Sequence, residues 1–564
     1  MSSAPAAGHT TADLVQAADD LLAYGGQHRM LQRRFYEDPD GVFPRFAVEA
    51  RGFELVDSDG RTFVDWLGGG GPLLLGYRHP AVEDAIAAQL SAGPTLSLMH
   101  SIELEVAAQL VQMIPCAETV AFGKNGSDAV TAAVRIARAT TGREVILQHG
   151  VHGFHDWYVA LHRVPGVPSA LTPLVSSFPY NDIPALEALF DRFDGKVAAV
   201  VMEPVNVQLP EPDYLQQVVE LAHDHGAIVV FDEMVTGFRL ANGGAQELFG
   251  VTPDLACFGK GLANGMPLSA VVGRSDLMHH LRSVAYGMTF RGETLSLAAA
   301  NAVLETLEQE GVAEHLAEVG QMVRAAFETA CRRQGISAEL KGPPARMTFE
   351  FADHGCVPGE RLEAIFLREC ARNGVLTNGN ILPFHAHDAD AVARTEVAFE
   401  EATKRATEAV EEGRAAIAKA VRVGFENALQ EQKVINDGAP SFAGSLDLAS
   451  DAGGRLVVHG WLMVSGEPAD LVEVIAATGH SVKAETMERP DLSEAFPASA
   501  GADGCGFAAV LPASEFLQNG GYRFSLVGRK RERVIFRCEV IREIEARRPL
   551  KSSARLGQDQ VLYL

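Results

Sequence analysis

The stretch "LACFGKGLANGMPLSAVVG" (Leu255–Gly273) holds one lysine between two short apolar runs. The runs "LACFG" and "LSAVVG" have the length of buried strands, and Lys260 stands just after the first one. Glycines and small apolar residues surround this lysine, whereas most lysines are solvated. A lysine in such a site has a lowered pKa and becomes a competent amine nucleophile. The chemistry suited to it is Schiff-base formation with a carbonyl.

From about residue 80 to 430, helical runs alternate with short apolar strands. The predicted strands are "TVAFG", "EVILQHG", "VAAVVMEP", "AIVVFDE", "LACFG" and "LSAVVG". The predicted helices include "DAVTAAVRIARATTG", "DYLQQVVELAHDHG" and "TLSLAAANAVLETLEQEG". Strands that alternate with helices predict an α/β fold with a parallel sheet covered on both faces.

Two acids end one of these strands. Asp232 and Glu233 close the apolar run "AIVVFDE", and ligands of open α/β sheets bind at the carboxyl ends of strands. An acid there can accept a hydrogen bond from a cationic ring nitrogen, although the pattern taken alone favours a turn or helix-capping acid. Lys260 ends the next predicted strand but is separated from Asp232 in sequence. The acid and the amine are therefore expected on neighbouring strands.

A second Phe-Gly-Lys stretch, "FGKNGSDAV" (Phe122–Val130), suggests a different role. A strand ends there, Gly126 and Ser127 follow, and a long helix begins. Such a turn can cradle a phosphate, although a capped helix without a ligand is the alternative. Neither stretch is a Walker loop, because Asn125 and Gly261 follow the lysines. A phosphate cradle, a buried acid and a Schiff-base lysine together describe a pyridoxal phosphate (PLP) site.

With these residues in place, the sequence resembles the class III aminotransferases, which have the fold type I architecture: a large, mainly parallel-sheet domain and a small α+β domain. Within that family it is most similar to the glutamate-1-semialdehyde aminomutase-like branch. The likeness runs from about 45 to 430 and includes "ELVDSDGRTFVDWLGGGGPLLLGYRHPAVEDAI", "NGSDAVTAAVRIARATTGR", "VHGFHDWY", "VMEPV", "VVFDEMVTGFR", "FGKGLANGMPLSAVVG" and "TFRGETLSLAAANAVL".

The resemblance implies roles for individual residues. Lys260 would form the Schiff base with the cofactor, Asp232 would pair with the pyridine nitrogen, and Glu203 would lie near the reacting atoms as a third catalytic residue. Lys124 precedes the cradle and is not the expected Schiff-base residue. The implied cofactor-binding set is Asn125, Gly126, Ser127, His152, Asp232, Met234, Lys260 and Thr289. Thr289 matches a threonine that reaches the phosphate of the other subunit, which implies a homodimer with shared sites.

One position departs from the family pattern. The family usually has an aromatic residue before His-Gly that stacks on one face of the cofactor ring, and Val151 stands there in this chain. Met234 occupies the position, usually valine, that packs on the other face. His152, Phe154 or Trp157 could take over the stacking role, or the ring is held less tightly.

The implied activity is that of a PLP-dependent transaminase, which moves an amino group between a small-molecule donor and an aldehyde or ketone acceptor by a ping-pong mechanism. One alternative is an intramolecular aminomutase of the glutamate-1-semialdehyde type, which needs no second substrate. An alternative of another class is a PLP-binding scaffold that delivers its C-terminal domain to a glycan or carrier. Dependence on a free amino donor, and cofactor turnover with amines, distinguish the three.

Composition limits the partners. The chain of 564 residues has a formal net charge of -25, which argues against nucleic-acid and anionic-membrane binding. Seven cysteines, none in a Cys-x-x-Cys pair, favour a reduced, cytoplasmic compartment. We predict no signal peptide and no membrane-spanning segment. The segment "PFHAHDAD" contains His385, His387, Asp388 and Asp390, but His-x-His alone is weak, so no metal site is predicted.

Changes in composition and hydrophobic pattern along the chain predict the domain boundaries. Residues 1–44 form a tail and a helix, and 45–431 form the aminotransferase-like domain, with its large cofactor part at about 80–300 and its small part from the flanking segments. Residues 47–69 read as two strands around an Asp-Gly turn. Residues 432–446 read as a linker, 447–545 as a β-sandwich, and 546–564 as a tail. The sandwich resembles domains attached to bacterial glycosyltransferases, and Trp461 fits its core better than a sugar platform.

Overall fold

A computed structural model describes residues 10–23, 41–287, 289–354 and 357–428, and beyond residue 441 it describes the strands alone. The predicted tail at 1–9 and most of the predicted linker lie outside these residues. The chain divides into two compact units. The first contains Met1–Ala330, Glu339–Glu350 and Leu367–Ala402, and the second contains Cys331–Ala338, Phe351–Phe366 and Thr403–Leu564.

The first unit is built on a seven-stranded sheet with the order β4-β10-β9-β8-β7-β5-β6. Its strands are β4 (Thr119–Gly123), β5 (Val145–His149), β6 (Val175–Ser177), β7 (Val197–Met202), β8 (Ile228–Asp232), β9 (Leu255–Phe258) and β10 (Ser269–Gly273). The pairs from β6 through β9 are parallel, and β10 runs antiparallel to both of its neighbours. The six predicted strands are confirmed, and the short β6 was not predicted.

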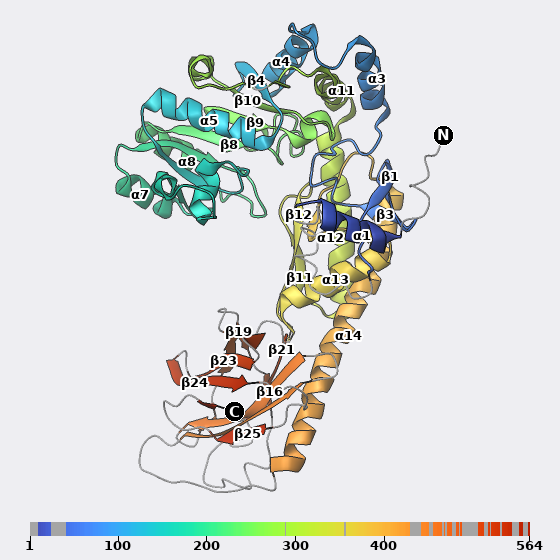
Figure 1. Cartoon of the computed structure of the whole chain (residues 1–564), viewed down its shortest axis with the longest axis vertical. Coiled ribbons are helices and arrows are strands. Elements are labelled where there is room, and N and C mark those ends of the chain that lie inside the picture. The colour runs from blue at the N-terminus through green and yellow to red at the C-terminus, as the bar shows by residue number, and fades with distance from the viewer. Residues whose placement is uncertain are drawn as a thin grey trace. The chain divides into compact units, whose positions relative to one another are not determined.

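Both faces of this sheet are covered, as a parallel sheet requires. In β8, Val230 packs in one apolar cluster while Val229 and Phe231 pack in the other, because successive side chains of a strand point to opposite faces. Helix α5 (Gly126–Thr141) covers the first face, together with α10 (Ser275–Met278). Helices α4 (Ser101–Met113), α8 (Tyr214–Asp224) and α11 (Thr294–Glu310) cover the second, and Figure 1 shows the sheet between these helices.

The helix ends follow local sequence signals. Asn125 precedes α5, the Asp128 carboxylate accepts a hydrogen bond from the Asn125 N–H at 2.8 Å, and Gly142 closes the helix with a φ of 66°. Glu293 caps α11 by accepting from the N–H of Leu295 at 2.5 Å. Other helices among the described residues are α3 (Pro80–Ala92), α6 (Asp156–Val159), α7 (Ile183–Arg192), α9 (Ala245–Phe249), α12 (Val312–Gln334), α13 (Gly359–Arg372) and α14 (Ala389–Ala428).

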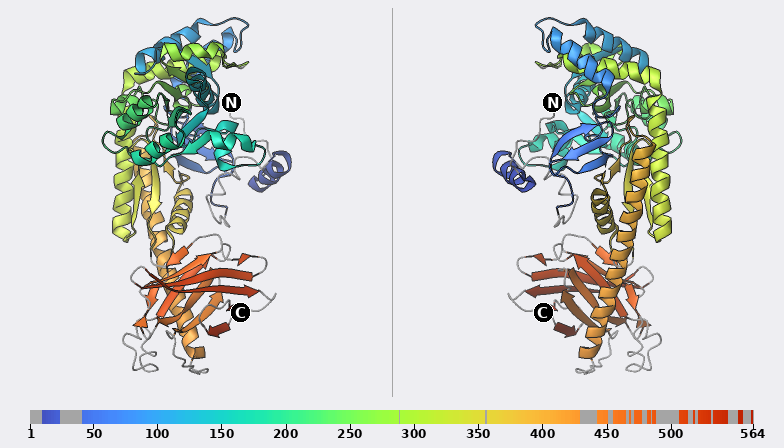
Figure 2. Two further views of the ribbon diagram at one scale, coloured as in Figure 1. Left: turned by 90° about the vertical axis from the view of Figure 1, so that its left-hand side faces the viewer. Right: turned by 90° about the vertical axis from the view of Figure 1, so that its right-hand side faces the viewer.

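Smaller sheets flank the large one in sequence. The segment predicted as two strands forms three, namely β1 (Ala47–Arg51), β2 (Glu54–Asp57) and β3 (Thr62–Asp65). The extra break is at Gly52, whose φ of 59° reverses the chain before β2, so the prediction missed one turn. β13 (Val375–Leu376) pairs parallel with β3. Helix α1 (Thr11–Leu21) lies at the β2–β3 turn, where Thr11 Oγ1 contacts Asp59 Oδ1 at 2.6 Å, and Figure 2 shows it from two sides.

A later part of the chain forms a three-stranded sheet with the order β11-β12-β14. Its strands are β11 (Ala338–Lys341), β12 (Met347–Phe351) and β14 (Asn380–Ile381). β12 pairs antiparallel with β14, and Thr348 Oγ1 donates to Asn380 Oδ1 at 2.9 Å. This pairing fixes the position of Arg346, which directly precedes β12.

Beyond residue 441 the structure describes strands in two sheets, β20-β21-β16-β15-β25 and β19-β18-β23-β24-β26. Their bounds are β15 (Phe442–Ser450), β16 (Arg455–Val464), β17 (Glu467–Pro468), β18 (Leu471–Ala476), β19 (Ser481–Lys483), β20 (Glu485–Met487), β21 (Gly506–Pro512), β22 (Leu517–Gln518), β23 (Gly521–Lys530), β24 (Arg533–Glu543), β25 (Ser552–Arg555) and β26 (Leu562–Tyr563). β15 begins within the predicted linker, and β25 and β26 lie within the predicted tail. The β-sandwich and these domain boundaries stay predictions.

Candidate active site

Three neighbouring strands of the large sheet end at one edge. β7, β8 and β9 are adjacent and parallel, and Asp232 on β8 is in register with Cys257 on β9. Glu203, Asp232 and Lys260 therefore stand at or just after the carboxyl ends of consecutive strands. The expectation that the acid and the amine lie on neighbouring strands is confirmed.

Lys260 has an unusual backbone and a buried amine. It opens the 3-10 turn η3 (Lys260–Ala263) with a φ of 45°, a left-handed value that non-glycine residues seldom adopt. Gly71 lies beside its side chain, because a Cβ built there would be 3.9 Å from Lys260 Nζ. Burial and the Arg346 charge lower the pKa of Lys260, and the negative charges of Asp232 and Glu203 oppose this effect. A larger fraction of this amine is therefore neutral than in an exposed lysine.

The two acids at the end of β8 have different partners. Asp232 accepts hydrogen bonds from the Met234 N–H at 3.1 Å and contacts His152 Nδ1 at 2.8 Å. Glu233 points elsewhere and accepts from the backbone N–H groups of Ala245 and Gln246 at 2.9 and 3.0 Å. It caps the start of α9, and burial raises its pKa. Glu233 is thus the helix-capping acid, whereas Asp232 lies at the edge of the sheet that carries Lys260.

The turn between β4 and α5 presents unpaired donors. The Asp128 carboxylate accepts from the backbone N–H groups of Lys124 and Asn125, at 3.2 and 2.8 Å. Among the described residues, no acceptor meets the N–H groups of Gly126 and Ser127 at the start of this 16-residue helix. Donors of this kind, together with the positive end of the helix dipole, suit a phosphate.

Close packing around this turn leaves no room for larger residues. A Cβ on Gly126 would lie 2.9 Å from the Met234 sulfur, and a Cβ on Gly153 would overlap the Ser127 hydroxyl. The Ser127 Oγ accepts a hydrogen bond from the Phe154 N–H at 3.2 Å. The loop at 151–154 is therefore seated on the cradle, and Met234 lies between the cradle and the β8 edge.

Lys124, the second candidate lysine, is engaged elsewhere. Its Nζ lies 2.9 Å from Glu293 Oε2 and 3.3 Å from Ser296 Oγ at the start of α11. It therefore holds the N-terminus of α11 against the end of β4, and its amine is paired with a carboxylate.

The residues considered for ring stacking are distributed differently. Val151 and Phe154 have exposed side chains, whereas the His152 and Trp157 side chains are buried. The His152 ring is bonded at both nitrogens, to Asp232 and to the His149 carbonyl oxygen at 2.9 Å. Trp157 donates its Nε1–H to Thr131 Oγ1 at 2.9 Å. His152 and Trp157 are thus fixed by other contacts, whereas Val151 and Phe154 are exposed and the Phe154 ring packs edge-on against His155.

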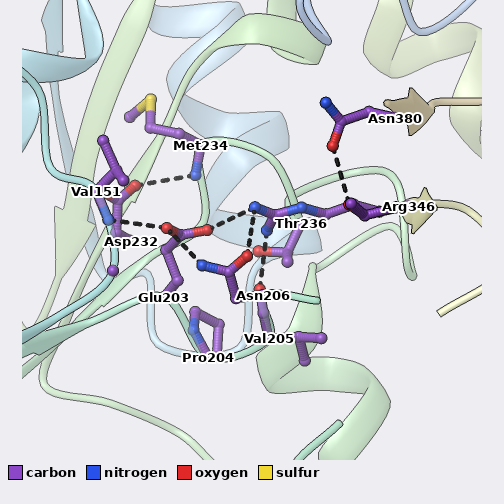
Figure 3. A network of polar contacts seen from close by, with 12 residues as sticks. Val151, Glu203, Pro204, Val205, Asn206, Asp232, Met234, Thr236, Arg346 and Asn380 are labelled. Carbon is purple, nitrogen blue, oxygen red and sulfur yellow. Dashed lines mark hydrogen bonds and ion pairs between the residues drawn. The ribbon is translucent and has the colours of Figure 1, made fainter. Parts of the chain in front are cut away.

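Glu203 belongs to a network that the sequence did not indicate (Figure 3). Its carboxylate accepts from the Val151 N–H at 2.9 Å and forms an ion pair with Arg346 Nη2 at 2.9 Å. Arg346 also donates to the Val205 carbonyl oxygen at 2.9 Å and to Asn206 Oδ1 at 3.2 Å. The network ties the loop that carries Val151 to the end of β7 and to the residue before β12.

Two further residues shape the site and were missed. Asn264 accepts at Oδ1 from the N–H groups of Leu74 and Leu75, both at 2.9 Å, and so holds the 71–76 loop against η3. Arg239 is fully buried, donates to the Gly71 and Pro383 carbonyl oxygens, and has its pKa lowered by burial to about 10. Both residues lie within motifs quoted from the sequence, because Arg239 ends "VVFDEMVTGFR" and Asn264 lies in "FGKGLANGMPLSAVVG".

The remaining candidates lie away from this cluster or have other partners. Thr289 is exposed in the turn before α11. His387 stacks on Trp66 with ring centroids 3.8 Å apart, and His385 approaches His315. Within the described ranges, no group of three or more His, Cys, Asp or Glu side chains could hold a metal ion. In the same part of the chain, no helix is long and apolar enough to cross a membrane.

A buried amine with a lowered pKa, a buried carboxylate on the adjacent strand and a helix start with free N–H groups fit the aldehyde, ring nitrogen and phosphate of PLP. This α/β fold and site define a PLP-dependent enzyme of fold type I. The chain belongs to the class III aminotransferase family, because the model of "Aminotransferase class-III" matches residues 35–384. Its cofactor is pyridoxal 5'-phosphate, and its substrates are small-molecule amino donors and acceptors.

Curated relatives carry two kinds of activity in their names. The chain is 36% identical over 320 residues to the 3-aminobutyryl-CoA aminotransferase of Cloacimonas acidaminovorans, a match that covers 55% of this chain and 77% of that protein. It is also 36% identical over 336 residues to the glutamate-1-semialdehyde 2,1-aminomutase of Roseiflexus castenholzii, covering 56% of this chain and 77% of that protein.

Solved structures share the fold. The FumI protein of Sphingopyxis sp. MTA144, in its PLP internal aldimine form, matches with a TM-score of 0.66 and 30% identity over 72% of this chain and 98% of its own. An omega-transaminase of Sphaerobacter thermophilus matches with a TM-score of 0.64 and 25% identity, over 71% of this chain and 98% of its own.

Proposed function

We propose that this chain is a transaminase whose catalytic residues are Lys260, Asp232 and Glu203. The observation that carries the proposal is the buried Lys260 amine beside the strand that ends in Asp232. Bound PLP supplies an aldehyde that reacts with amines and a conjugated ring that accepts electrons from the carbon next to the amine. The residues around it supply binding, orientation and proton transfer.

Different parts of the site bind the phosphate and the ring of PLP. The N–H groups of Gly126 and Ser127 bind the phosphate, and Asn125 holds the turn that presents them. The Asp232 carboxylate would accept a hydrogen bond from the protonated ring nitrogen, which would keep that nitrogen cationic. Met234, whose side chain lies against Gly126, would pack against one ring face, and Val151 would stand on the other side.

Lys260 serves as both nucleophile and base. Burial is the main cause that lowers the pKa of its amine, so a larger fraction is neutral and nucleophilic than in an exposed lysine. With cofactor and substrate bound, Lys260 Nζ would be the base that takes the proton from the substrate carbon. Glu203 fixes the Val151 loop through its hydrogen bond to the Val151 N–H.

The two lysines that follow Phe-Gly can be separated by chemical labelling. Borohydride reduction of the holoenzyme followed by peptide mapping should place the phosphopyridoxyl label on Lys260. Lys260→Ala should lose the label and almost all activity, since one residue supplies nucleophile and base. Lys124→Ala is the matched control and should keep the label. A label on Lys124 would contradict the assignment.

An aminomutase is the second candidate, because a relative at 36% identity bears that name. A transaminase requires a separate donor and acceptor, whereas an aminomutase moves the amino group within one molecule. A screen of amino donors against the enzyme, read from the change in cofactor absorbance, separates the two. Turnover of an amino aldehyde without any added donor would favour the aminomutase.

A homodimer with shared sites is part of the proposal. Thr289 is exposed and stands in the turn before α11, where a second copy would cover it and bring it to that copy's phosphate. Dilution to monomers should then release cofactor. Sedimentation of a fully active monomer would refute this arrangement.

The proposal also covers the cellular compartment of the chain and the role of its C-terminal strands. We place the chain in the cytoplasm, because its seven cysteines, none in a Cys-x-x-Cys pair, suggest a reducing compartment. We assign the region from 447 to 545 to a β-sandwich that contacts a glycan or carrier, a role supported by the sequence resemblance alone.

A further inference from the structure

The segment 151–154 contacts both ends of the candidate cofactor site. At the phosphate end, the Phe154 N–H donates to the Ser127 hydroxyl of the cradle at 3.2 Å. At the opposite end, the His152 ring lies 2.8 Å from Asp232, the residue assigned to the ring nitrogen. A cofactor bound between the cradle and Asp232 would therefore lie along this segment.

The backbone of the segment is fixed by its neighbours. The Val151 N–H donates to the Glu203 carboxylate at 2.9 Å, and the Arg346 guanidinium holds that carboxylate at 2.9 Å. Gly153 has a φ of 94°, and a Cβ there would overlap the Ser127 hydroxyl, so the backbone touches the cradle directly. Because the chain is held on both sides of residue 152, it cannot shift to make up for a short side chain at position 151.

The aromatic side chains considered for ring stacking are engaged elsewhere. The His152 ring is bonded at both nitrogens, and the buried Trp157 donates its indole N–H to a threonine of α5 at 2.9 Å. The Phe154 ring packs edge-on against His155, with ring centroids 5.0 Å apart. Val151 is therefore left as the side chain of this segment that would meet the cofactor, and it is 68% exposed.

A valine covers less of a flat ring than an aromatic side chain does, and it presents only methyl groups. Space left above the ring would thus be bounded by apolar surface, which an apolar group fills better than water does. The segment after β7 adds further apolar surface, because Val207 and Leu209 have exposed side chains. This segment adjoins Val151, since the Asn206 amide donates at 3.3 Å to the same Glu203 carboxylate.

We propose that Val151 is a specificity-determining residue, which leaves one face of the cofactor open to a bulky apolar group of the substrate. The proposal rests on the proposed transaminase function and names the substrate class of that site: amines that carry a large apolar substituent on the reacting carbon. A small amine would leave the space to water and would gain no binding energy there.

The first measurement is PLP binding to the cofactor-free protein. Val151→Phe supplies the missing ring and should bind PLP about three- to tenfold more tightly than the wild type, as expected for an added aromatic pair. Val397→Phe is the matched control, because Val397 is 61% exposed and lies on α14, which carries none of the proposed site residues. Its PLP affinity should equal that of the wild type. If Val151→Phe binds PLP no more tightly, that face is already covered and the proposal is wrong.

The second measurement compares 1-phenylethylamine with isopropylamine, which differ by a phenyl in place of a methyl group on the reacting carbon. The wild type should have the higher kcat/KM for the phenyl amine. Val151→Phe should reduce this preference about tenfold or more, because apolar pockets discriminate by size, whereas Val151→Ala, which enlarges the space, should keep it.

Three outcomes of this comparison would overturn the proposal: a wild type without a preference for the phenyl amine, an unchanged preference in Val151→Phe, or an equal loss in Val151→Ala. If neither amine changes the cofactor absorbance of the wild type, the substrate class is wrong. A missing phosphopyridoxyl label on Lys260 after borohydride reduction would refute the proposed function instead.

Discussion

Removing Arg346 should expose how much the Glu203 network depends on a buried ion pair. Arg346→Met takes away the cation 2.9 Å from Glu203 Oε2 and leaves the carboxylate with the Val151 N–H and the Asn206 amide, at 2.9 and 3.3 Å. The two side chains are 15% and 8% exposed, so the remaining carboxylate is poorly hydrated.

The burial of this pair sets the expected loss in the free energy of unfolding. A lost hydrogen bond to a charged group costs roughly 1.5–3 kcal/mol, and breaking a fully buried pair costs about 3–5 kcal/mol. Arg346 keeps some contact with solvent, so we expect the free energy of unfolding to fall by about 3 kcal/mol. In Glu203→Gln/Arg346→Met the uncompensated charge is absent, and the double variant should be more stable than Arg346→Met alone.

Urea unfolding of the cofactor-free protein, followed by tryptophan fluorescence, measures these differences. Arg78→Met is a matched control, because its partner Glu83 lies at 2.8 Å but both side chains are about half exposed, at 56% and 46%. This variant should change the midpoint far less. If Arg346→Met behaves like the control, or if the effects of the two single changes simply add in the double variant, the pair does not act as a buried unit.

Three further changes test other parts of the site. Gly153→Ala should weaken PLP binding to the cofactor-free protein, because the new methyl group overlaps the Ser127 hydroxyl. Gly166→Ala is the control: Gly166 has a similar φ of 89° and nothing within 4 Å of an added Cβ, so this variant should bind PLP normally. Equal affinities of the two variants would refute the packing argument. Glu203→Gln removes a charge that raises the pKa of Lys260, so covalent attachment of PLP should reach half its maximal rate at a lower pH, and a midpoint that moves upward would contradict the assigned sign. A chain ended near Gln432 should still bind PLP and complete half-reactions, as absorbance would show, and loss of all binding by a folded truncation would refute this.

The sequence alone predicted six of the seven strands of the large sheet. Alternation such as Val229, Val230 and Phe231 on β8 places side chains on two apolar faces, which is a local property of an extended chain. Because parallel strands end at one edge, Asp232 and Lys260 could be placed together before any coordinates were known. The free helix start at Gly126 was equally local, since capping depends on residues within one turn.

Only the tertiary structure assigned different roles to residues adjacent in sequence, and only it brought together residues far apart in sequence. Asp232 and Glu233 are adjacent, and their different roles emerge because Glu233 meets the start of α9 while Asp232 meets His152. Arg346 reaches Glu203 across a sequence separation that carries no pattern, because the pairing of β12 with β14 sets its position. Such contacts depend on how segments pack, and packing partners are not encoded in local periodicity or capping.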